Sequence, residues 1–196
     1  MTKKYKSIAV FGGASASISS VYHEYMRRTG ELLAEQGVTM VFGIGDEGVM
    51  GSTFQGVRNK NGKVLGITTL KLLELQCKDP TVFQLDEIKV VPNLSRRKMD
   101  MFKISDALLI GPGGWGTMDE FSEFAVLTQT GDIPKKPMIF LNYNGFWRPM
   151  QELLLNMLQE GTVNQSRVDY VDFVDEPEEI MEALDRVQNR IDAHQK

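Results

Sequence analysis

The sequence has little of the chemistry on which disulfides and metal sites depend. Cys77 is the only cysteine among 196 residues, so neither an internal disulfide nor a cysteine-based metal cluster can form. Only two histidines are present, His23 and His194, and no motif places carboxylates around either of them. We therefore predict no metal site, no catalytic role for His23 on the face of its helix, and a buried or incidental thiol at Cys77.

Long apolar runs are missing as well. Residues 1–7 are charged and lead directly into an apolar strand pattern, without a signal-like segment. No run has the length that a membrane span needs. The net charge of −4 gives no electrostatic reason to expect nucleic acid or an anionic membrane as a partner. The sequence thus predicts a cytoplasmic protein.

No repeat or linker divides the chain, which predicts one domain over residues 1–196. Short runs rich in β-branched residues alternate with amphipathic stretches, and most runs are apolar on both faces, as in parallel sheets covered by helices. This order predicts an α/β fold, Rossmann-like and doubly wound, with a mostly parallel sheet of about seven strands and helices on both faces. The predicted strands are residues 7–11, 38–42, 64–68, 88–91, 107–110, 137–141 and 170–174. The predicted helices are residues 19–36, 47–59, 93–104, 117–130, 146–160 and 176–193, with a short helix and a loop between residues 70 and 87.

Three glycine-rich loops follow predicted strands, at residues 11–15, 42–51 and 111–117. Ligands of open α/β sheets bind at this carboxyl edge. Glycine allows close approach of the backbone, and a helix N-terminus offers free N–H groups and partial positive charge, so the loops predict a site for a phosphorylated ligand. None is a Walker loop, and the first does not complete the dinucleotide fingerprint, which argues against an ATPase or a dehydrogenase.

Arg97 and Glu120 are predicted to meet at the same edge. Glu120 is expected in the first turn of the helix after residues 111–117, and Arg97 near the start of a helix with Asn93 as its N-cap. An arginine, a carboxylate and a phosphate cradle around one cavity suit cleavage of a ribosyl–base bond through an oxocarbenium-like state. Two plainer interpretations remain: Glu120 complements a helix dipole, and residues 96–98 form a solvated face.

The segment PGGWGTMDE, residues 112–120, resembles the PGGxGTxxE motif of the Lonely Guy family of cytokinin riboside 5′-monophosphate phosphoribohydrolases, often described as lysine decarboxylase-like. RKMDM at residues 97–101 is similar to that family's RKxxM segment, and residues 43–51 are similar to its GGGxxGLMG loop. The likeness extends from residue 7 to residue 161.

This resemblance implies a Rossmann-like homodimer that needs neither a metal nor an organic cofactor. It implies hydrolysis of the N-glycosidic bond of a nucleoside 5′-monophosphate, either a cytokinin riboside monophosphate or an AMP-like substrate, to a free base and ribose 5-phosphate. Arg97 and Glu120 are implied as the catalytic pair. The residues expected to bind the substrate or its phosphate are Gly113, Gly114, Gly116, Thr117, Lys98, Ser15 and Gly45.

Departures from the family pattern leave the base preference open. Ile44 replaces the middle glycine of the second loop, Thr128 stands where tryptophan is usual, and residues 93–96 differ from the usual run before the Arg-Lys pair. A lysine decarboxylase needs pyridoxal phosphate on a lysine, commonly beside a histidine, and the chain has no His-Lys pair. A non-enzymatic carrier of a nucleotide or phosphorylated cofactor is the competing hypothesis, and fold alone cannot separate the two. The presence of both Arg97 and Glu120 favours the hydrolase.

Overall fold

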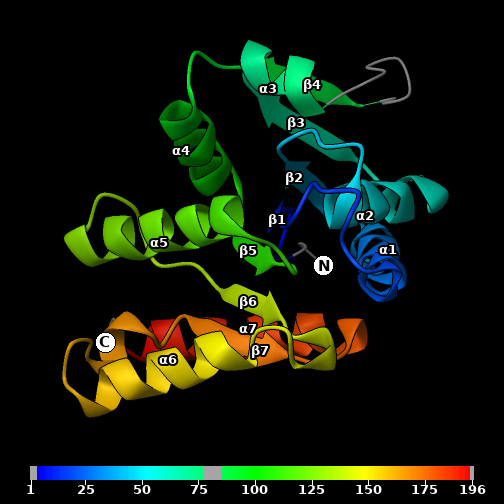
Figure 1. Ribbon diagram of the computed structural model, residues 1–196. Helices are drawn as coiled ribbons and strands as arrows, with labels where there is room; N and C mark the ends of the chain where they lie inside the picture. The colour runs from blue at the N-terminus through cyan, green and yellow to red at the C-terminus, as the bar shows by residue number, and fades with distance from the viewer. Residues whose placement is uncertain (1–3, 77–84, 195–196) are drawn as a thin grey trace.

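The computed structural model describes residues 4–76 and 85–194, in which a seven-stranded sheet lies between helices (Figure 1). Every strand pairs in parallel with its neighbours, in the order β4-β3-β2-β1-β5-β6-β7. The predicted α/β class and parallel sheet are therefore confirmed. The elements are β1 (Ser7–Phe11), α1 (Ser20–Glu35), β2 (Thr39–Phe42), α2 (Gly48–Asn59), β3 (Val64–Thr68), α3 (Leu70–Gln76), β4 (Glu87–Val90), α4 (Leu94–Ile104), β5 (Ala107–Ile110), α5 (Trp115–Thr130), β6 (Met138–Leu141), η2 (Tyr143–Gly145), α6 (Arg148–Gln159), η3 (Gln165–Arg167), β7 (Val171–Val174), η4 (Pro177–Glu179) and α7 (Ile180–Ala193).

The order of the strands reverses between β1 and β5. The chain starts at β1 in the middle of the sheet, runs outward to β4, returns to pair β5 with β1, and then runs to β7 at the other edge. Right-handed crossovers in opposite directions place helices on opposite faces, and Figure 1 shows α1 and α2 on one side with α4 and α5 on the other. Such a reversal separates the loops that follow the two strands and creates a crevice for a ligand.

The central strands are buried on both faces. All four residues of β5 and all four of β6 are inaccessible to solvent, as the continuous apolar runs of these segments predict. β4 differs because it is an edge strand, and Ile88 and Val90 are about half exposed there. The rigid centre of the sheet therefore lies directly beneath the crevice.

Two helix starts determine where the charged residues point. Asn93 caps α4 as predicted, since its Oδ1 accepts a hydrogen bond of 2.8 Å from the backbone N–H of Arg96. α5 begins at Trp115, two residues earlier than predicted, with Gly114 as N-cap. Glu120 consequently lies in the second turn of α5 rather than the first.

The segment between residues 70 and 87 contains the expected short helix, α3. Cys77, predicted to be a buried or incidental thiol, lies outside the described residues. His23 is partly buried on α1, where its Nδ1 lies 2.8 Å from Ser52 Oγ and its Nε2 lies 3.2 Å from the carbonyl of Ile18. This histidine therefore joins α1 to α2 and to the loop before α1.

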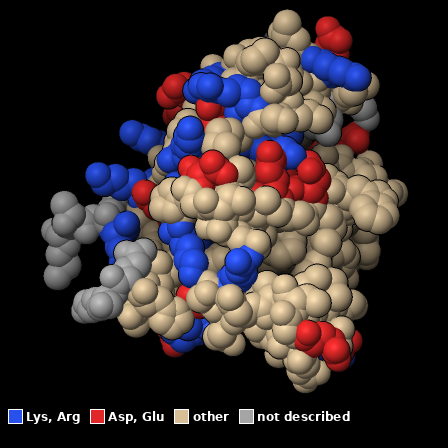
Figure 2. Space-filling model, turned by 90° about the vertical axis from the view of Figure 1, so that its left-hand side faces the viewer, with Lys and Arg blue, Asp and Glu red and all other residues tan. Residues whose placement is uncertain are grey.

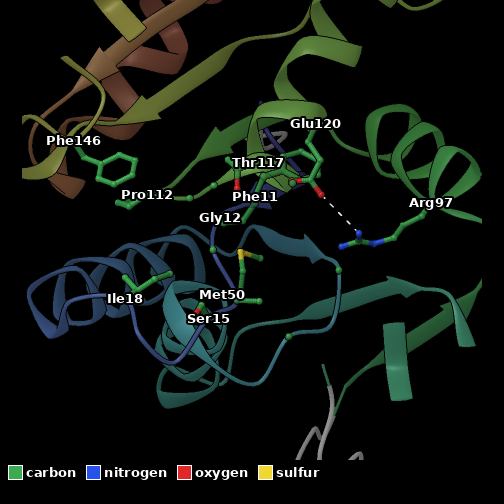
Figure 3. A pocket seen from close by; sticks show the side chains of 18 residues that line it. Phe11, Gly12, Ser15, Ile18, Met50, Arg97, Pro112, Thr117, Glu120 and Phe146 are labelled. Atoms are coloured by element: carbon green, nitrogen blue, oxygen red, sulfur yellow. Dashed lines mark ion pairs between the residues drawn. The ribbon is translucent and has the colours of Figure 1, made fainter. Parts of the chain in front are cut away.

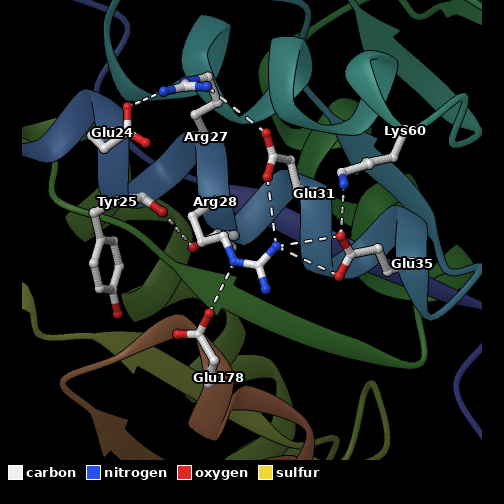
Figure 4. Close-up of polar contacts among 9 residues, drawn as sticks. Glu24, Tyr25, Arg27, Arg28, Glu31, Glu35, Lys60 and Glu178 are labelled. Carbon is white, nitrogen blue, oxygen red and sulfur yellow. Dashed lines mark hydrogen bonds and ion pairs between the residues drawn. The ribbon is translucent and has the colours of Figure 1, made fainter.

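Ion pairs on α1 connect distant parts of the chain (Figure 4). Arg28 Nε lies 2.9 Å from Glu178 of η4, and Arg28 Nη1 lies 3.3 Å from Glu35. Lys60, after α2, lies 3.1 Å from the same Glu35 carboxylate. Because these side chains are partly exposed, each pair contributes little to the free energy of unfolding, but together the pairs connect α1 with both neighbours.

Candidate active site

A cavity of about 550 Å³ opens at the carboxyl ends of β1, β2 and β5 (Figure 3). Its walls come from all three glycine-rich loops and from the two helices that carry Arg97 and Glu120. The structure brings every predicted site residue except Lys98 to this cavity. These lining residues are Ser15, Gly45, Arg97, Gly113, Gly114, Gly116, Thr117 and Glu120.

The N-terminus of α5 is the part of the wall best suited to an anion. Its N-cap, Gly114, has no side chain that could accept hydrogen bonds from the first backbone N–H groups of the helix. The first of these N–H groups with a partner is that of Met118, which donates to the Gly114 carbonyl at 3.0 Å. The backbone N–H groups of residues 115–117 donate to no group among the described residues. α2 is different, because its Val49 N–H already donates to the carbonyl of Gly13 at 3.0 Å. Of these two helices, α5 therefore offers the amides and positive dipole end that bind phosphate.

Arg97 enters the cavity from α4 by passing directly over Gly43. Arg97 Nε donates a hydrogen bond of 3.2 Å to the carbonyl of Ile67, which fixes the direction of the guanidinium. A Cβ atom built on Gly43 would lie only 1.5 Å from Arg97 Nη2. Burial lowers the pKa of Arg97, although the nearby Glu120 carboxylate opposes this effect, and a guanidinium remains charged in proteins. Gly43 is thus needed for the path of the arginine side chain.

Glu120 faces Arg97 at one end of the cavity, and Arg97 Nη1 lies 3.8 Å from Glu120 Oε1. Burial raises the pKa of Glu120 to about 7, with Arg97 as the main opposing influence. The carboxyl group therefore changes its charge near neutral pH. A buried carboxyl of this kind, in a cleft and beside a specific charged partner, is typical of catalytic groups.

Lys98 points away from the cavity into the contact between α4 and α5. Its Nζ lies 2.6 Å from Asp119 Oδ2 and 2.6 Å from Glu123 Oε2, and it is not among the lining residues. Asp119 directly precedes Glu120, just as Lys98 directly follows Arg97. The lysine therefore ties together the two helices that carry the facing pair.

Known proteins share both the sequence pattern and the fold. The family model described as "Possible lysine decarboxylase" matches residues 50–184. Cytokinin riboside 5′-monophosphate phosphoribohydrolase LOG1 of Arabidopsis thaliana is 32% identical over 161 residues, which is 82% of this chain and 74% of that protein. The chain belongs to the Lonely Guy family. A further relative, "Probable cytokinin riboside 5′-monophosphate phosphoribohydrolase LOGL2" of Oryza sativa subsp. japonica, is 29% identical over 182 residues, 93% of this chain and 73% of that protein.

A solved structure outside the Lonely Guy relatives has the same fold. The molybdenum cofactor carrier protein of Chlamydomonas reinhardtii superposes with a TM-score of 0.66 and covers 95% of this chain and 99% of its own. Its sequence is 18% identical, so the likeness shows the fold alone.

The departure from the Lonely Guy loop at Ile44 has a clear structural outcome. Ile44 adopts a positive φ of 59°, so it keeps the left-handed backbone that glycine adopts readily and a β-branched residue rarely does. Its side chain is 1% exposed and lies against Gly66 in β3, on the side of the loop away from the cavity. The cost of that conformation is about 1–2 kcal/mol, offset by burial of the side chain.

Sequence reasoning missed the apolar end of the cavity. Ile18, Met50 and Phe146 line it, and Figure 3 shows Ile18 and Phe146 across the cavity from Arg97 and Glu120. Isolated apolar residues carry no sequence signal that separates a cavity wall from a core. Only the arrangement of the loops after β1 and β6 brings Ile18 and Phe146 together.

The described ranges of the chain contain neither a candidate metal site nor a candidate membrane-spanning helix. Residues 4–76 and 85–194 contain no group of three or more His, Cys, Asp or Glu side chains placed to hold a metal ion. No helix in the same ranges is both long and apolar enough to cross a bilayer. The expected absence of a cofactor and the cytoplasmic location stay predictions.

The raised pKa of Glu120 predicts an unusual dependence of stability on pH. Between its ordinary pKa of 4.5 and about 7, the unfolded chain has already released the proton that the folded protein retains, so the folded state loses stability as the pH rises. We expect the wild type to lose about 2–3 kcal/mol of unfolding free energy relative to Glu120→Gln between pH 4.5 and pH 8. Urea unfolding of both proteins at these pH values measures the difference, and parallel pH profiles would contradict the assignment.

Proposed function

We propose that this protein hydrolyses the N-glycosidic bond of a nucleoside 5′-monophosphate, releasing a free base and ribose 5-phosphate. The observation that carries the proposal is the pairing of Arg97 with Glu120 in the same cavity as the free amides of α5. The names of the Lonely Guy relatives support it, since they describe phosphoribohydrolases of cytokinin riboside 5′-monophosphates.

The proposed reaction uses water and groups of the chain itself. The phosphate binds the amides of residues 115–117 and thereby places the ribose beside Glu120. The Glu120 carboxylate holds a ribose hydroxyl or orients the water, and its negative charge stabilises the oxocarbenium-like state. The water oxygen bonds to C1′ while the C1′–N bond breaks. The attacking water gives up one proton and the departing base gains one, so the products are the free base and ribose 5-phosphate. Arg97 limits the rise in the pKa of Glu120 and so favours its anionic form, and it can bind an oxygen of the substrate.

The test is direct incubation of the purified protein with AMP and, separately, with isopentenyladenosine 5′-monophosphate. Equal amounts of free base and ribose 5-phosphate, measured by chromatography, would support the proposal. Tight binding of either nucleotide without cleavage would instead favour the competing hypothesis of a non-enzymatic carrier. The ratio of the two rates would also reveal the base preference, which the departures at Ile44 and Thr128 leave open.

Lys98 is proposed to position the catalytic pair. Replacing it by methionine removes the bridge between α4 and α5, so we expect kcat to fall about tenfold with KM little changed, because the phosphate-binding amides are untouched. Lys103→Met, an exposed change on the same helix, is the matched control and should behave as wild type. A rise in KM at constant kcat would instead indicate that Lys98 contacts the substrate directly.

A homodimer is proposed to form through the face that carries α4 and α5. Figure 2 shows charged side chains of both signs scattered over this side of the molecule, with broad areas of other residues between them. Three apolar side chains on these two helices are more than half exposed, namely Leu94, Trp115 and Val126. Removing them from water in an interface would be favourable, because exposed apolar surface raises the free energy of the protein in water. We expect Val126→Asp to convert a dimer to a monomer in sedimentation experiments. A monomeric wild type would rule out this interface.

A further inference from the structure

A second cavity, of about 240 Å³, lies at the opposite end of α5 from the candidate active site. Its walls come from the last turns of α5, from Lys135 in the following loop, and from residues 164–170 ahead of β7. α5 has 16 residues, so about 24 Å separates its two ends. The two cavities share no lining residue.

The charged residues that line this second cavity are all positive. They are Lys135 and Arg167, and no aspartate or glutamate is among the lining residues. Lys135 is already neutralised, since its Nζ lies 3.0 Å from both carboxylate oxygens of Asp169, a buried residue that also pairs with His194. Arg167 is partly buried and forms no ion pair with any residue in the described ranges. Among the described residues, one positive charge in the cavity therefore lacks a counter-charge.

Neutral hydrogen-bonding groups surround this free guanidinium. Gln129, Ser166 and Tyr170 line the wall beside it, and the Ser166 hydroxyl already donates to Asn164 Oδ1 at 2.8 Å, so Ser166 Oγ can only accept a further hydrogen bond. A planar guanidinium binds carboxylate or phosphate oxygens bidentately, and the amide of Gln129 is a further donor among the lining residues. We infer that this cavity is a second binding site, which takes a small metabolite through its carboxylate or phosphate group.

Size supports a small ligand of this class. The volume is below that of cavities for drug-sized molecules, which begin at about 300 Å³. Thr128 contributes to the space because its side chain is short and its hydroxyl turns back to the carbonyl of Phe124 at 3.0 Å. A tryptophan at this position, as in the family pattern, would project a much larger side chain toward the cavity.

Inorganic phosphate is a suitable probe, and the backbone amide signals of the protein in NMR report each cavity separately. With wild type, we expect saturable shifts of the signals of residues 164–170. Arg167→Gln should weaken this response at least about tenfold, whereas the exposed control Arg148→Gln should not. Thr128→Trp, which fills the cavity without removing a charge, should also abolish the response while the remaining spectrum shows a folded protein.

The inference fails if the signals of residues 164–170 do not move, or if Arg167→Gln titrates as wild type does. The signals of residues 113–117 test a different claim, namely phosphate binding at the N-terminus of α5. If those signals stay still while residues 164–170 respond, the proposed active site is weakened and the second site stands. If the signals of residues 113–117 move and those of residues 164–170 do not, only the inference of a second binding site is overturned.

Discussion

Replacing Glu120 by glutamine is expected to lower kcat for nucleoside monophosphate cleavage by about 10²–10⁴-fold. The amide has nearly the same shape as the carboxyl group but cannot carry the negative charge that opposes the oxocarbenium-like state. Binding of the substrate should change much less, because the amides of residues 115–117 remain. Single-turnover and steady-state assays with AMP measure the two effects separately.

The pH profile provides an independent readout of the same carboxyl group. Since burial raises the pKa of Glu120 to about 7, kcat/KM of the wild type should fall below neutral pH as the carboxylate takes up a proton. The exposed control Glu152→Gln should retain both the wild-type kcat and the fall in kcat/KM below neutral pH. Unchanged turnover in Glu120→Gln would remove Glu120 from the mechanism.

Changing Gly43 to alanine is expected to reduce kcat/KM by about 10²-fold although Gly43 carries no functional group. The added Cβ would occupy the position of the Arg97 guanidinium, 1.5 Å from Nη2, and would force it away from Glu120. The displaced atoms are the far end of a flexible side chain, so we expect the melting temperature to change by only a few degrees. Kinetic assays together with calorimetry measure both quantities.

A double-mutant cycle shows whether Gly43 acts through Arg97. Arg97→Met alone should cause a loss similar to that of Gly43→Ala, and the double variant should be no worse than Arg97→Met. Fully additive losses would mean that the alanine disturbs the ligand directly. That result would mean that Gly43 contacts the substrate and does not determine the direction of the Arg97 side chain.

The sequence was sufficient for most of the fold because its central strands are apolar on both faces and its glycines mark the turns. It also predicted that Arg97 and Glu120 would meet, since parallel strands bring distant loops to one edge. The start of α5 was predicted two residues late, because Gly114 caps the helix without a side chain and leaves no capping residue to recognise.

Side-chain direction was the information that the sequence did not contain. Arg97 and Lys98 are adjacent on α4 and therefore point about 100° apart, so at most one of them faces straight into the cavity. Which one does so depends on how α4 packs against α5, where Asp119 and Glu123 receive the lysine. The apolar wall at Ile18 and Phe146 likewise depends on packing between segments far apart in the chain.

Ile44 and Gly66 occupy a single shared volume. A Cβ on Gly66 would lie 2.5 Å from Cγ1 and Cδ1 of Ile44, so a larger residue in β3 is compatible only with a smaller one in the loop. The two positions should therefore covary when related sequences are compared, with a glycine at one site accompanying a bulkier residue at the other. If the second loop evolved to contain only glycines, we expect both positions to change. Replacing Ile44 alone would leave a hole in the core, and enlarging Gly66 alone would create a clash.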